Sequence, residues 1–452
     1  MVTEAGGPPA LSPRQQTAVT NLQRHWRGLS RRLHVLRKWS WAVSNGLENR
    51  EEQRMVELGM FVESIAEELA MDRAGAPSLE RRNTVGHKSL LAGGLKSLVS
   101  GLKSTEPQAS GSVKSEPPEP KPFTLRFPLR EADVLEMVAG FSRGQQLSRG
   151  SVEQLLDLHV EVLQPLPNVV RFDVPAGQEL CIVGDLHGQF EDLMHIFRTH
   201  GFPSADRPFL FNGDFVDRGT QSVEVLLTLY AWQQLLPGSV MLNRGNHEER
   251  SVNVRNGFEN ECAQKYDGDM HDRFVATFAW LPLGTIVNGK VLVVHGGVDD
   301  DLTLANLEAA PRNEYQISEG LRNNKRRGSL MHPAMIAQQA AQTEREDRIR
   351  PITSVLWNDP MEDEGTRPND VRSIGVFFGP GVARRFLRKE DLGLIVRSHE
   401  QVQAGVHWPY GAGRHLVTVF SASNYSGKMQ NQGAFALLGS AADAAAAATA
   451  AR

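Results

Sequence analysis

Cysteine and long apolar runs are scarce in this sequence. Only Cys181 and Cys262 carry thiols among its 452 residues, which is too few for the disulfide framework of a small secreted domain. No apolar stretch approaches the roughly 18 residues of a membrane span, and the first thirty residues lack the apolar core of a signal peptide. We therefore expect a soluble protein with reduced thiols in the cytoplasm, with the nucleus as the alternative.

Acidic residues are missing from one N-terminal segment. Residues 5–47 contain Arg and Lys but neither Asp nor Glu, although the whole chain has a formal net charge of -4. From about residue 18 to 43, apolar side chains recur every three or four positions, which predicts an amphipathic helix. Such a basic helix suits packing on a catalytic domain, an anionic membrane surface, or an acidic partner with a groove.

Composition divides the chain into six predicted parts. The segment at 73–122 is rich in Ser, Gly, Pro, Lys and Glu. It therefore cannot bury enough apolar surface to offset the entropy lost on ordering. The parts are a disordered start (1–17), the basic helix (18–46), an acidic amphipathic helix (47–72), a disordered linker (73–122), a catalytic domain (123–440) and an Ala-rich low-complexity tail (441–452).

Apolar runs and helical patterns alternate through the predicted catalytic domain. This alternation indicates an α/β domain. Two helical patterns occur within 131–164, strands are predicted at 179–183, 208–212 and 239–243 with helices at about 189–199 and 221–235 between them, and further strands are predicted at 291–294, 392–396 and 416–420. A longer polar stretch at 299–352 shows no such pattern.

Polar side chains follow three of these predicted strands. Asp185 and His187 come after the first, Asp214 after the second, and Asn246 and His247 after the third. Because α/β sheets place their sites at the ends of strands, we expect these side chains to converge. Histidines also follow two of the later strands. Asp, His and Asn side chains in this arrangement describe a metal centre.

The candidate ligands supply nitrogen and oxygen but no thiolate. Such a mixed set suits Mn, Fe or Zn, whereas an all-oxygen set would have favoured Ca or Mg. Two divalent ions about 3.5–4 Å apart need one ligand that bridges them. A single histidine is more often structural, but here six candidates arise at five strand ends: Asp185, His187, Asp214, Asn246, His295 and His399.

The motifs around these residues carry a family resemblance. GDLHGQ, GDFVDRG, RGNHE, HGG, RSHE and SASNY resemble the signature set of the PPP family of Ser/Thr protein phosphatases, over roughly residues 123–438. The resemblance implies a metallophosphoesterase-like αββα sandwich, here with an N-terminal helical regulatory extension. It also implies a ligand set in which the first metal takes Asp185, His187 and Asp214, and the second takes Asp214, Asn246, His295 and His399, with Asp214 bridging.

The resemblance implies the hydrolysis of phosphoserine and phosphothreonine by a hydroxide that two metals activate. His247 would be the general acid that protonates the departing seryl or threonyl oxygen, and Asp217 would orient it. Arg218 and Arg372 would clamp the phosphoryl oxygens. Tyr425 would line the substrate cleft beside the ligand at position 246. The expected substrates are phosphoproteins.

The basic helix resembles a calmodulin-binding IQ motif. The combination of this helix, a linker and Phe127-Pro128-Leu129 with the catalytic motifs resembles the retinal-degeneration-C branch, which bears EF-hands. No EF-hand loop pattern occurs in this sequence, so we expect calcium to act through a calmodulin-like partner. The motif residues are Leu22, Gln23, Arg27, Gly28 and Arg32, and the apolar anchors are Trp26, Leu29 and Leu33.

Several other residues are assigned ordinary structural roles. Arg244 is expected to form a buried salt bridge behind the site, and Glu248 to support its loop. Residues 299–301 form an acidic run that we expect to be a solvated turn rather than a ligand set. Thr84 and Ser329 lie in patterns that resemble basophilic kinase sites, although such short patterns are frequent by chance.

Two other functions stay open. A metallophosphoesterase acting on nucleotides or dinucleoside polyphosphates would share part of the metal core, but Arg372 and Tyr425 argue against it. An inactive scaffold that binds calmodulin is the second alternative, and the complete set of candidate ligands and catalytic residues argues against it. Nucleic acid is not an expected partner.

Overall fold

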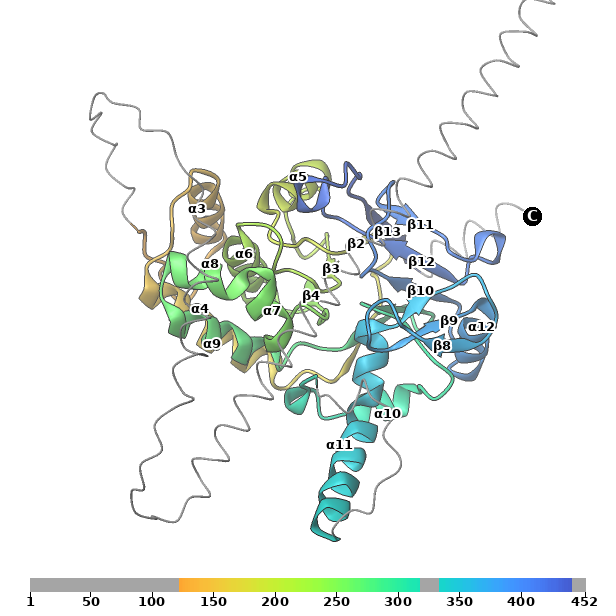
Figure 1. Cartoon of the computed structure of the whole chain (residues 1–452). Helices are drawn as coiled ribbons and strands as arrows, with labels where there is room; N and C mark the ends of the chain where they lie inside the picture. Colours follow the sequence, from red (N-terminus) through yellow and green to blue (C-terminus); the bar gives the residue numbers. More distant parts are fainter. Residues whose placement is uncertain (1–121, 318–332, 441–452) are drawn as a thin grey trace, which may run out of the picture. The chain divides into compact units, whose positions relative to one another are not determined.

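Figure 1 shows the computed structural model, which describes residues 122–317 and 333–440. Within these residues, no helix is long and apolar enough to cross a membrane. Both cysteines are buried and free. The predictions outside the described residues are the basic helix at 18–46 with its IQ-like motif, the acidic helix at 47–72, nearly all of the linker at 73–122, the tail at 441–452, and the kinase-like sites at Thr84 and Ser329.

Two sheets form the centre of the fold. The first contains, in order, β13 (Phe435–Gly439), β2 (Glu179–Val183), β3 (Phe209–Phe211) and β4 (Val240–Leu242). The second contains β1 (Val169–Phe172), β5 (Gly284–Val287), β6 (Val291–Val294), β10 (Leu394–Arg397), β12 (Leu416–Val419) and β11 (Val406–His407). The six strands predicted from the sequence all occur: two match the predicted ranges, and the ends of the other four differ by at most two residues.

Alternating side chains pack the two sheets against each other. In β2, Leu180 and Ile182 belong to the apolar layer between the sheets, whereas Cys181 and Val183 belong to the cluster on the outer side. Strands β3, β4, β6, β10 and β12 also contribute to the layer between the sheets. Because strand side chains point alternately to opposite faces, each sheet buries one face against its neighbour and the other under helices.

Helices cover the outer face of each sheet (Figure 1). The four-stranded sheet shares an apolar cluster with α3 (Glu131–Ser142), α4 (Arg149–Leu163), α5 (Phe190–His200), α6 (Ser222–Leu235), α8 (Phe258–Lys265) and α9 (Gly268–Phe278). The six-stranded sheet shares another with α7 (Arg250–Asn256), α10 (Leu304–Ala309), α11 (Pro333–Trp357) and α12 (Pro380–Lys389). These four layers confirm the αββα sandwich.

The polar stretch at 299–352 contains most of a long helix that the sequence pattern did not predict. Helix α11 continues to Trp357 and has Pro351 inside it. Apolar side chains are buried only in its last turns, from Ile349 onward among the described side chains. A small sheet follows it, formed by β7 (Asp359–Pro360), β9 (Val376–Phe378) and β8 (Thr366–Pro368).

Parallel strands bring the predicted site residues to one edge of the sandwich. Strands β2, β3 and β4 run parallel to one another, and β6, β10 and β12 run parallel in the other sheet. Residues that follow these strands therefore meet where the carboxyl ends of the strands lie. Asp185 bridges the two sheets there, because its backbone pairs with Phe420 just after β12.

One buried histidine in the helical layer generates a stability prediction. His159 of α4 is fully buried and stacks on Tyr230 of α6 with 3.6 Å between ring centroids. Neither ring nitrogen has a hydrogen-bond partner within the described residues, and burial lowers the pKa of His159 to about 3. An unsatisfied buried polar group costs about 1–3 kcal/mol. His159→Leu should therefore raise the free energy of unfolding by about 1 kcal/mol, and a lower Tm in thermal denaturation would contradict this.

Candidate metal centre

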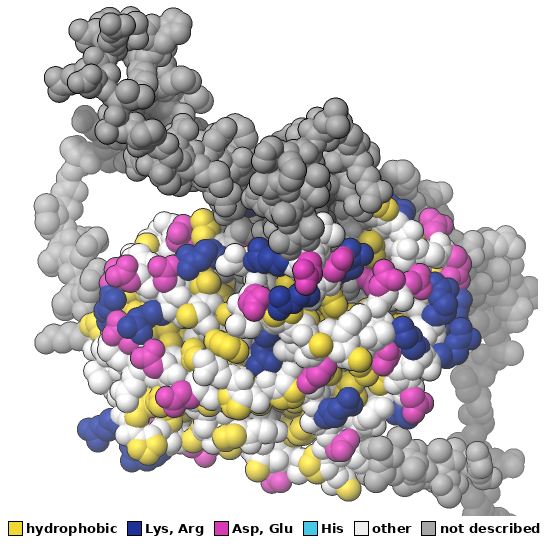
Figure 2. All heavy atoms as spheres, turned by 90° about the horizontal axis from the view of Figure 1, so that it is seen from below, with side chains coloured by type: hydrophobic (Ala, Val, Ile, Leu, Met, Phe, Trp, Pro, Cys, Tyr) yellow, Lys and Arg dark blue, Asp and Glu magenta, His cyan; other side chains and the backbone are white. Residues whose placement is uncertain are grey.

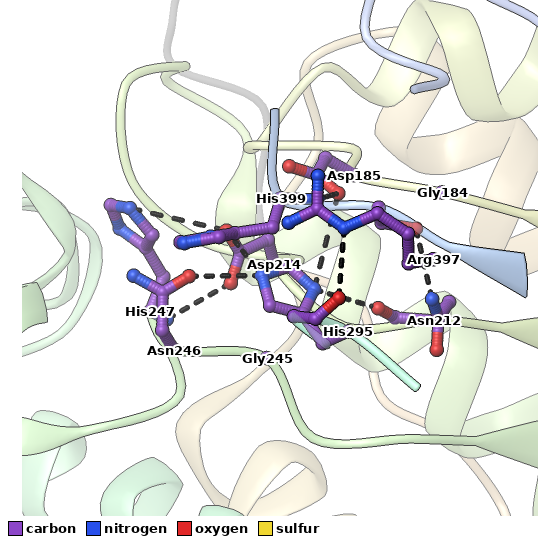
Figure 3. A network of polar contacts seen from close by, with 12 residues as sticks. Gly184, Asp185, Asn212, Asp214, Gly245, Asn246, His247, His295, Arg397 and His399 are labelled. Atoms are coloured by element: carbon purple, nitrogen blue, oxygen red, sulfur yellow. Dashed lines mark hydrogen bonds and ion pairs between the residues drawn. The ribbon is translucent and has the colours of Figure 1, made fainter. Parts of the chain in front are cut away.

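The predicted ligands lie at the ends of five strands, and Figure 3 shows them converging, apart from His187, which it does not label. Asp185 and His187 follow β2, Asp214 follows β3, Asn246 follows β4, His295 follows β6, and His399 follows β10. All six are buried, with exposures between 0% and 6%. Such burial is unusual for so many polar side chains and requires that they find partners among themselves or in a ligand.

Asp214 lies at the middle of the cluster. Its Oδ2 is 3.2 Å from His295 Nε2 and 3.5 Å from His187 Nε2. Two groups of potential metal-binding atoms share this carboxylate, each with all atoms within 4.8 Å: His187, Asp214 and His247 form one, and Asp214, His295 and His399 the other. A carboxylate common to two groups is the arrangement that a pair of bridged ions requires.

Asp185 completes the first group. Its Oδ2 is 3.7 Å from His187 Nε2 and has no hydrogen-bond partner within the described residues, while its Oδ1 accepts the backbone N–H of His399 at 3.0 Å. His247 also lies near, but its Nδ1 is 2.6 Å from Asp217 Oδ2 and its Nε2 is 4.0 Å from Asp214 Oδ2. We therefore place Asp185 among the ligands and His247 beside them.

Backbone contacts orient the histidine rings toward the centre. Nδ1 of His187 donates to the carbonyl of Val216 at 2.8 Å, and Nδ1 of His295 donates to the carbonyl of Asn212 at 2.9 Å. A ring whose Nδ1 donates in this way presents the lone pair of Nε2, which is how ligating histidines are usually held. The Asn246 Oδ1 lies 2.9 Å from His295 Nε2 and thus joins the second group.

The donor set fits two divalent ions. His399 Nε2 is buried without a hydrogen-bond partner among the described residues, and burial together with the Arg372 guanidinium lowers its pKa, so its ring is neutral. Burial would raise the pKa of Asp214, but the neighbouring imidazoles, His295 first, outweigh burial and lower it. Burial would lower the pKa of His295, but the Asp214 carboxylate outweighs burial and raises it, so a bound cation would displace the proton of that imidazole. The predicted two-metal cofactor is therefore confirmed in its outline.

The site is built on strained backbone. Non-glycine residues His187, Asp214, Asp217, Arg218 and His399 have φ between 44° and 74°, a region that costs of order 1–3 kcal/mol for such residues. Gly245, in the loop after β4, is required for steric reasons. A Cβ on residue 245 would lie 2.2 Å from the Asp214 Oδ1 atom, so only glycine lets the two loops approach.

Glu248 supports these loops as expected. Its carboxylate accepts the backbone N–H groups of Asp214, Phe215 and Gly245 at 2.7–2.9 Å. The expected salt bridge of Arg244 is wrong, because this side chain forms no ion pair within the described residues. It donates instead to the carbonyls of Glu248 and Arg312, at 3.0 and 2.9 Å. A buried guanidinium can be satisfied by carbonyls when no carboxylate faces it.

The acidic run at 299–301 is a turn, but not simply a solvated one. Asp299 Oδ1 accepts the backbone N–H groups of residues 301 and 302. Its Oδ2 accepts from Ser354 at 2.5 Å, and Asp300 pairs with Arg385 of α12 at 2.6 Å. The turn thus ties α11 and α12 to the sheet, and neither metal-ligand group in the described residues includes it.

Arg372 and Arg218, the two residues predicted to bind phosphate, differ in how their side chains are held. Arg372 is 6% exposed, and its Nε is 2.6 Å from Asp359 Oδ2. Asp359 Oδ1 also binds the buried Arg397 at 2.9 Å, so one carboxylate fixes two guanidinium groups. Arg218 is half-buried, and its backbone N–H donates to Asn256 at 3.2 Å. Asp359 could not be predicted from the sequence, because a lone Asp at the end of a polar stretch carries no distinguishing pattern.

Tyr425 reaches the first ligand group. Its side chain is 3% exposed, and its hydroxyl is 3.3 Å from His187 Nε2. The loop that carries it is held by Asn431, whose Oδ1 accepts the Tyr425 backbone N–H at 2.8 Å. Asp192 of α5 holds the same loop by accepting both the N–H and the hydroxyl of Ser423 at 2.7 Å. The six predicted ligands, His247 and Tyr425 therefore lie together, whereas the predicted calmodulin-binding residues lie outside the described residues.

Comparisons with known proteins agree with this geometry. A model of the calcineurin-like phosphoesterase family matches residues 179–403. Serine/threonine-protein phosphatase 5 of Arabidopsis thaliana is 37% identical over 332 residues, covering 73% of this chain and 54% of the relative. Phosphatase rdgC of Drosophila melanogaster is 31% identical over 425 residues, covering 92% and 58%. A solved phosphatase of Saccharomyces cerevisiae, described as similar to human PP5, has a TM-score of 0.57 at 32% identity, covering 68% and 87%.

The fold and the shared-carboxylate centre are those of a metallophosphoesterase. With the similarities above, this chain belongs to the PPP family of Ser/Thr protein phosphatases. The matches to rdgC and, at 35% identity, to mouse serine/threonine-protein phosphatase with EF-hands 1 are consistent with the expected branch. The chain spans about half the length of these relatives.

The shared carboxylate generates a prediction on metal content. After loading with Mn²⁺ and gel filtration, the full chain should retain about two Mn²⁺ per molecule. Asp214→Asn should retain fewer than about one, because an amide cannot bridge two cations as a carboxylate does. Elemental analysis measures both. Asp299→Asn is the matched control and should keep about two, whereas two ions retained by the Asp214 variant would refute the bridging assignment.

Proposed function

We propose that this chain is a two-metal protein phosphatase that hydrolyses phosphoserine and phosphothreonine. The observation that carries the proposal is the pair of ligand groups that share Asp214, with His247 held beside them by Asp217. The relatives named above are Ser/Thr protein phosphatases and supply the substrate class. Mn, Fe and Zn remain the candidate metals on the chemistry of the donor set.

The protein's own residues would move the proton. When bound, a pair of divalent ions polarises the phosphoryl group and makes hydroxide available near neutral pH. The departing serine or threonine oxygen needs a proton, and His247 is placed to donate it from Nε2. Burial raises the pKa of Asp217 while the hydrogen bond to His247 opposes that shift. An ionised Asp217 at 2.6 Å from Nδ1 favours the charged imidazole that a general acid requires.

The phosphoryl oxygens would be bound by guanidinium groups. Arg372 is fixed by Asp359 before any substrate arrives, so less side-chain entropy is lost on binding. Arg218 directly follows Asp217, the partner of His247, in the same loop. Two planar donors on one phosphoryl group offset the charge that develops as the bond to the leaving oxygen breaks.

Figure 2 shows the charge pattern on one face of the described residues. On the face seen in Figure 2, basic and acidic side chains of the described residues are interspersed, and no stripe of one sign crosses it. Binding to a nucleic-acid backbone depends on a clustered basic surface. The names of the relatives favour phosphoprotein substrates, and a dinucleoside polyphosphate is the alternative to test.

A phosphopeptide assay tests the proposal. With Mn²⁺, the full chain should release phosphate from a phosphoserine peptide and leave a dinucleoside polyphosphate essentially intact. His247→Gln should lower kcat by about 10²–10³ with little change in KM, because it removes proton donation to the leaving group. Turnover of the dinucleotide in preference to the peptide would overturn the substrate class.

We also propose that a calmodulin-like protein regulates the enzyme through residues 18–43. The support is the sequence alone, since this segment lies outside the described residues. Trp26→Ala combined with Arg27→Ala should abolish retention of the full chain on immobilised calmodulin, because both an apolar anchor and a motif cation are lost. Phe61→Ala with Glu63→Ala in the acidic segment is the control and should bind normally. Unchanged retention of the first variant, with and without calcium, would refute the proposal.

A further inference from the structure

A buried polar chain connects the helical layer to the loop that carries His247. Nε2 of His271, in α9, is 2.7 Å from Asn253 Oδ1, in α7. The Asn253 Nδ2 in turn donates to the backbone carbonyl of His247 at 3.2 Å. His271 is 1% exposed and Asn253 is 0% exposed. Two side chains from helices outside the metal centre thus reach the candidate general acid.

Nothing in the mechanism above uses His271. It belongs to an apolar part of α9, between the buried Met270 and Phe274, and its ring lies 5.8 Å from that of Phe258. Burial lowers the pKa of His271 to about 4, so the ring is neutral and carries a single N–H. Burying an imidazole costs free energy unless the ring is hydrogen-bonded, and Asn253 supplies that bond here.

The hydrogen bonds of this chain have one consistent direction. An amide oxygen only accepts, so His271 must carry its proton on Nε2 to bond with Asn253 Oδ1. The His247 carbonyl can only accept, so it fixes the Asn253 amide with Nδ2 toward it, and the Oδ1 that then faces His271 selects the Nε2–H tautomer. The reverse orientation would place two oxygens against each other and leave both carbonyl groups unsatisfied. His271 therefore anchors the Asn253 amide in the orientation that holds the backbone of His247.

Three of the contacts that hold His247 come from different parts of the chain. Its ring Nδ1 contacts Asp217 at 2.6 Å, its backbone N–H donates to Asp214 Oδ1 at 2.9 Å, and its carbonyl accepts from Asn253. The first two contacts belong to the motif loops, and the third comes from a helix packed behind them. Loss of this third contact would let the backbone of His247 shift, and small displacements of a reacting group lower rates strongly.

We propose that His271 is a positioning residue for the general acid, acting through Asn253 on the backbone of His247. The proposal rests on the protein phosphatase function stated above. It predicts a defect confined to proton donation. Substrates with a leaving group that departs without a proton should be turned over almost normally when His271 is replaced, whereas substrates with a poor leaving group should not.

The test compares leaving groups in three variants of the full chain with Mn²⁺. The substrates are a phosphoserine peptide and phenyl phosphate, which need a proton donor, and 4-nitrophenyl phosphate, which does not. His271→Leu should lower kcat about tenfold on the first two and less than about twofold on the third, with KM unchanged. His271→Gln, whose Nε2 can donate to Asn253 in the same way, should restore the peptide rate.

His159→Leu is the matched control. It also removes a fully buried histidine from the helical layer, but His159 forms no hydrogen bond within the described residues. It should leave the ratio of the peptide rate to the 4-nitrophenyl phosphate rate at the wild-type value. The contrast between two buried His→Leu changes separates positioning from a general loss of packing.

Each outcome decides the proposal. Equal losses on all three substrates in His271→Leu, or no recovery in His271→Gln, overturn it while leaving the phosphatase function intact. If His271→Leu does not fold, Asn253→Asp decides instead, because it has the same shape but loses the donor to His247 and should show the same selective loss. A wild-type chain that does not hydrolyse the peptide overturns the phosphatase function and this proposal with it.

Discussion

Asp214 is the residue on which the rest of the centre depends. Its Oδ2 faces the imidazoles of His187 and His295, and its Oδ1 accepts the backbone N–H of His247. Its backbone carbonyl accepts two N–H groups from the loop after β2, at residues 186 and 187, and its N–H donates to Glu248. One residue therefore joins the loops of three parallel strands, so the geometry of both proposed ions follows from where its carboxylate is held.

This arrangement requires a rigid scaffold. Several buried charges and left-handed residues are concentrated at one edge, and each is unfavourable by itself. The apolar layers between and outside the sheets supply the compensating stability, because strands β2, β3 and β4 are buried on both faces. Glu248 and Asp359 add the local restraints, one by accepting backbone N–H groups and the other by pairing two guanidinium groups. Side chains held in place in this way can stabilise charge that develops in a transition state without first having to reorganise.

Much of the fold and of the ligand set could be predicted from the sequence, because strand periodicity and glycine-bounded polar motifs are local signals. The loops after β2, β3 and β4 were predicted for that reason. The supporting residues could not be, since Asp359 and the His271–Asn253 pair act across long sequence separations and show no pattern of their own. Helix α11 was missed because its charged turns lack an apolar stripe and, among its described side chains, the buried apolar ones begin at Ile349. Arg244 shows the same limit, since a buried salt bridge was expected where two backbone carbonyls accept its hydrogen bonds instead.

The central claim is that two cations share the Asp214 carboxylate. Anomalous diffraction from crystals of the Mn²⁺-loaded protein measures this most directly. The account predicts two peaks about 3.5–4 Å apart, one on each side of the Asp214 carboxylate, with His187 near one and His295 and His399 near the other. A single peak, or two peaks that do not both contact Asp214, would contradict it.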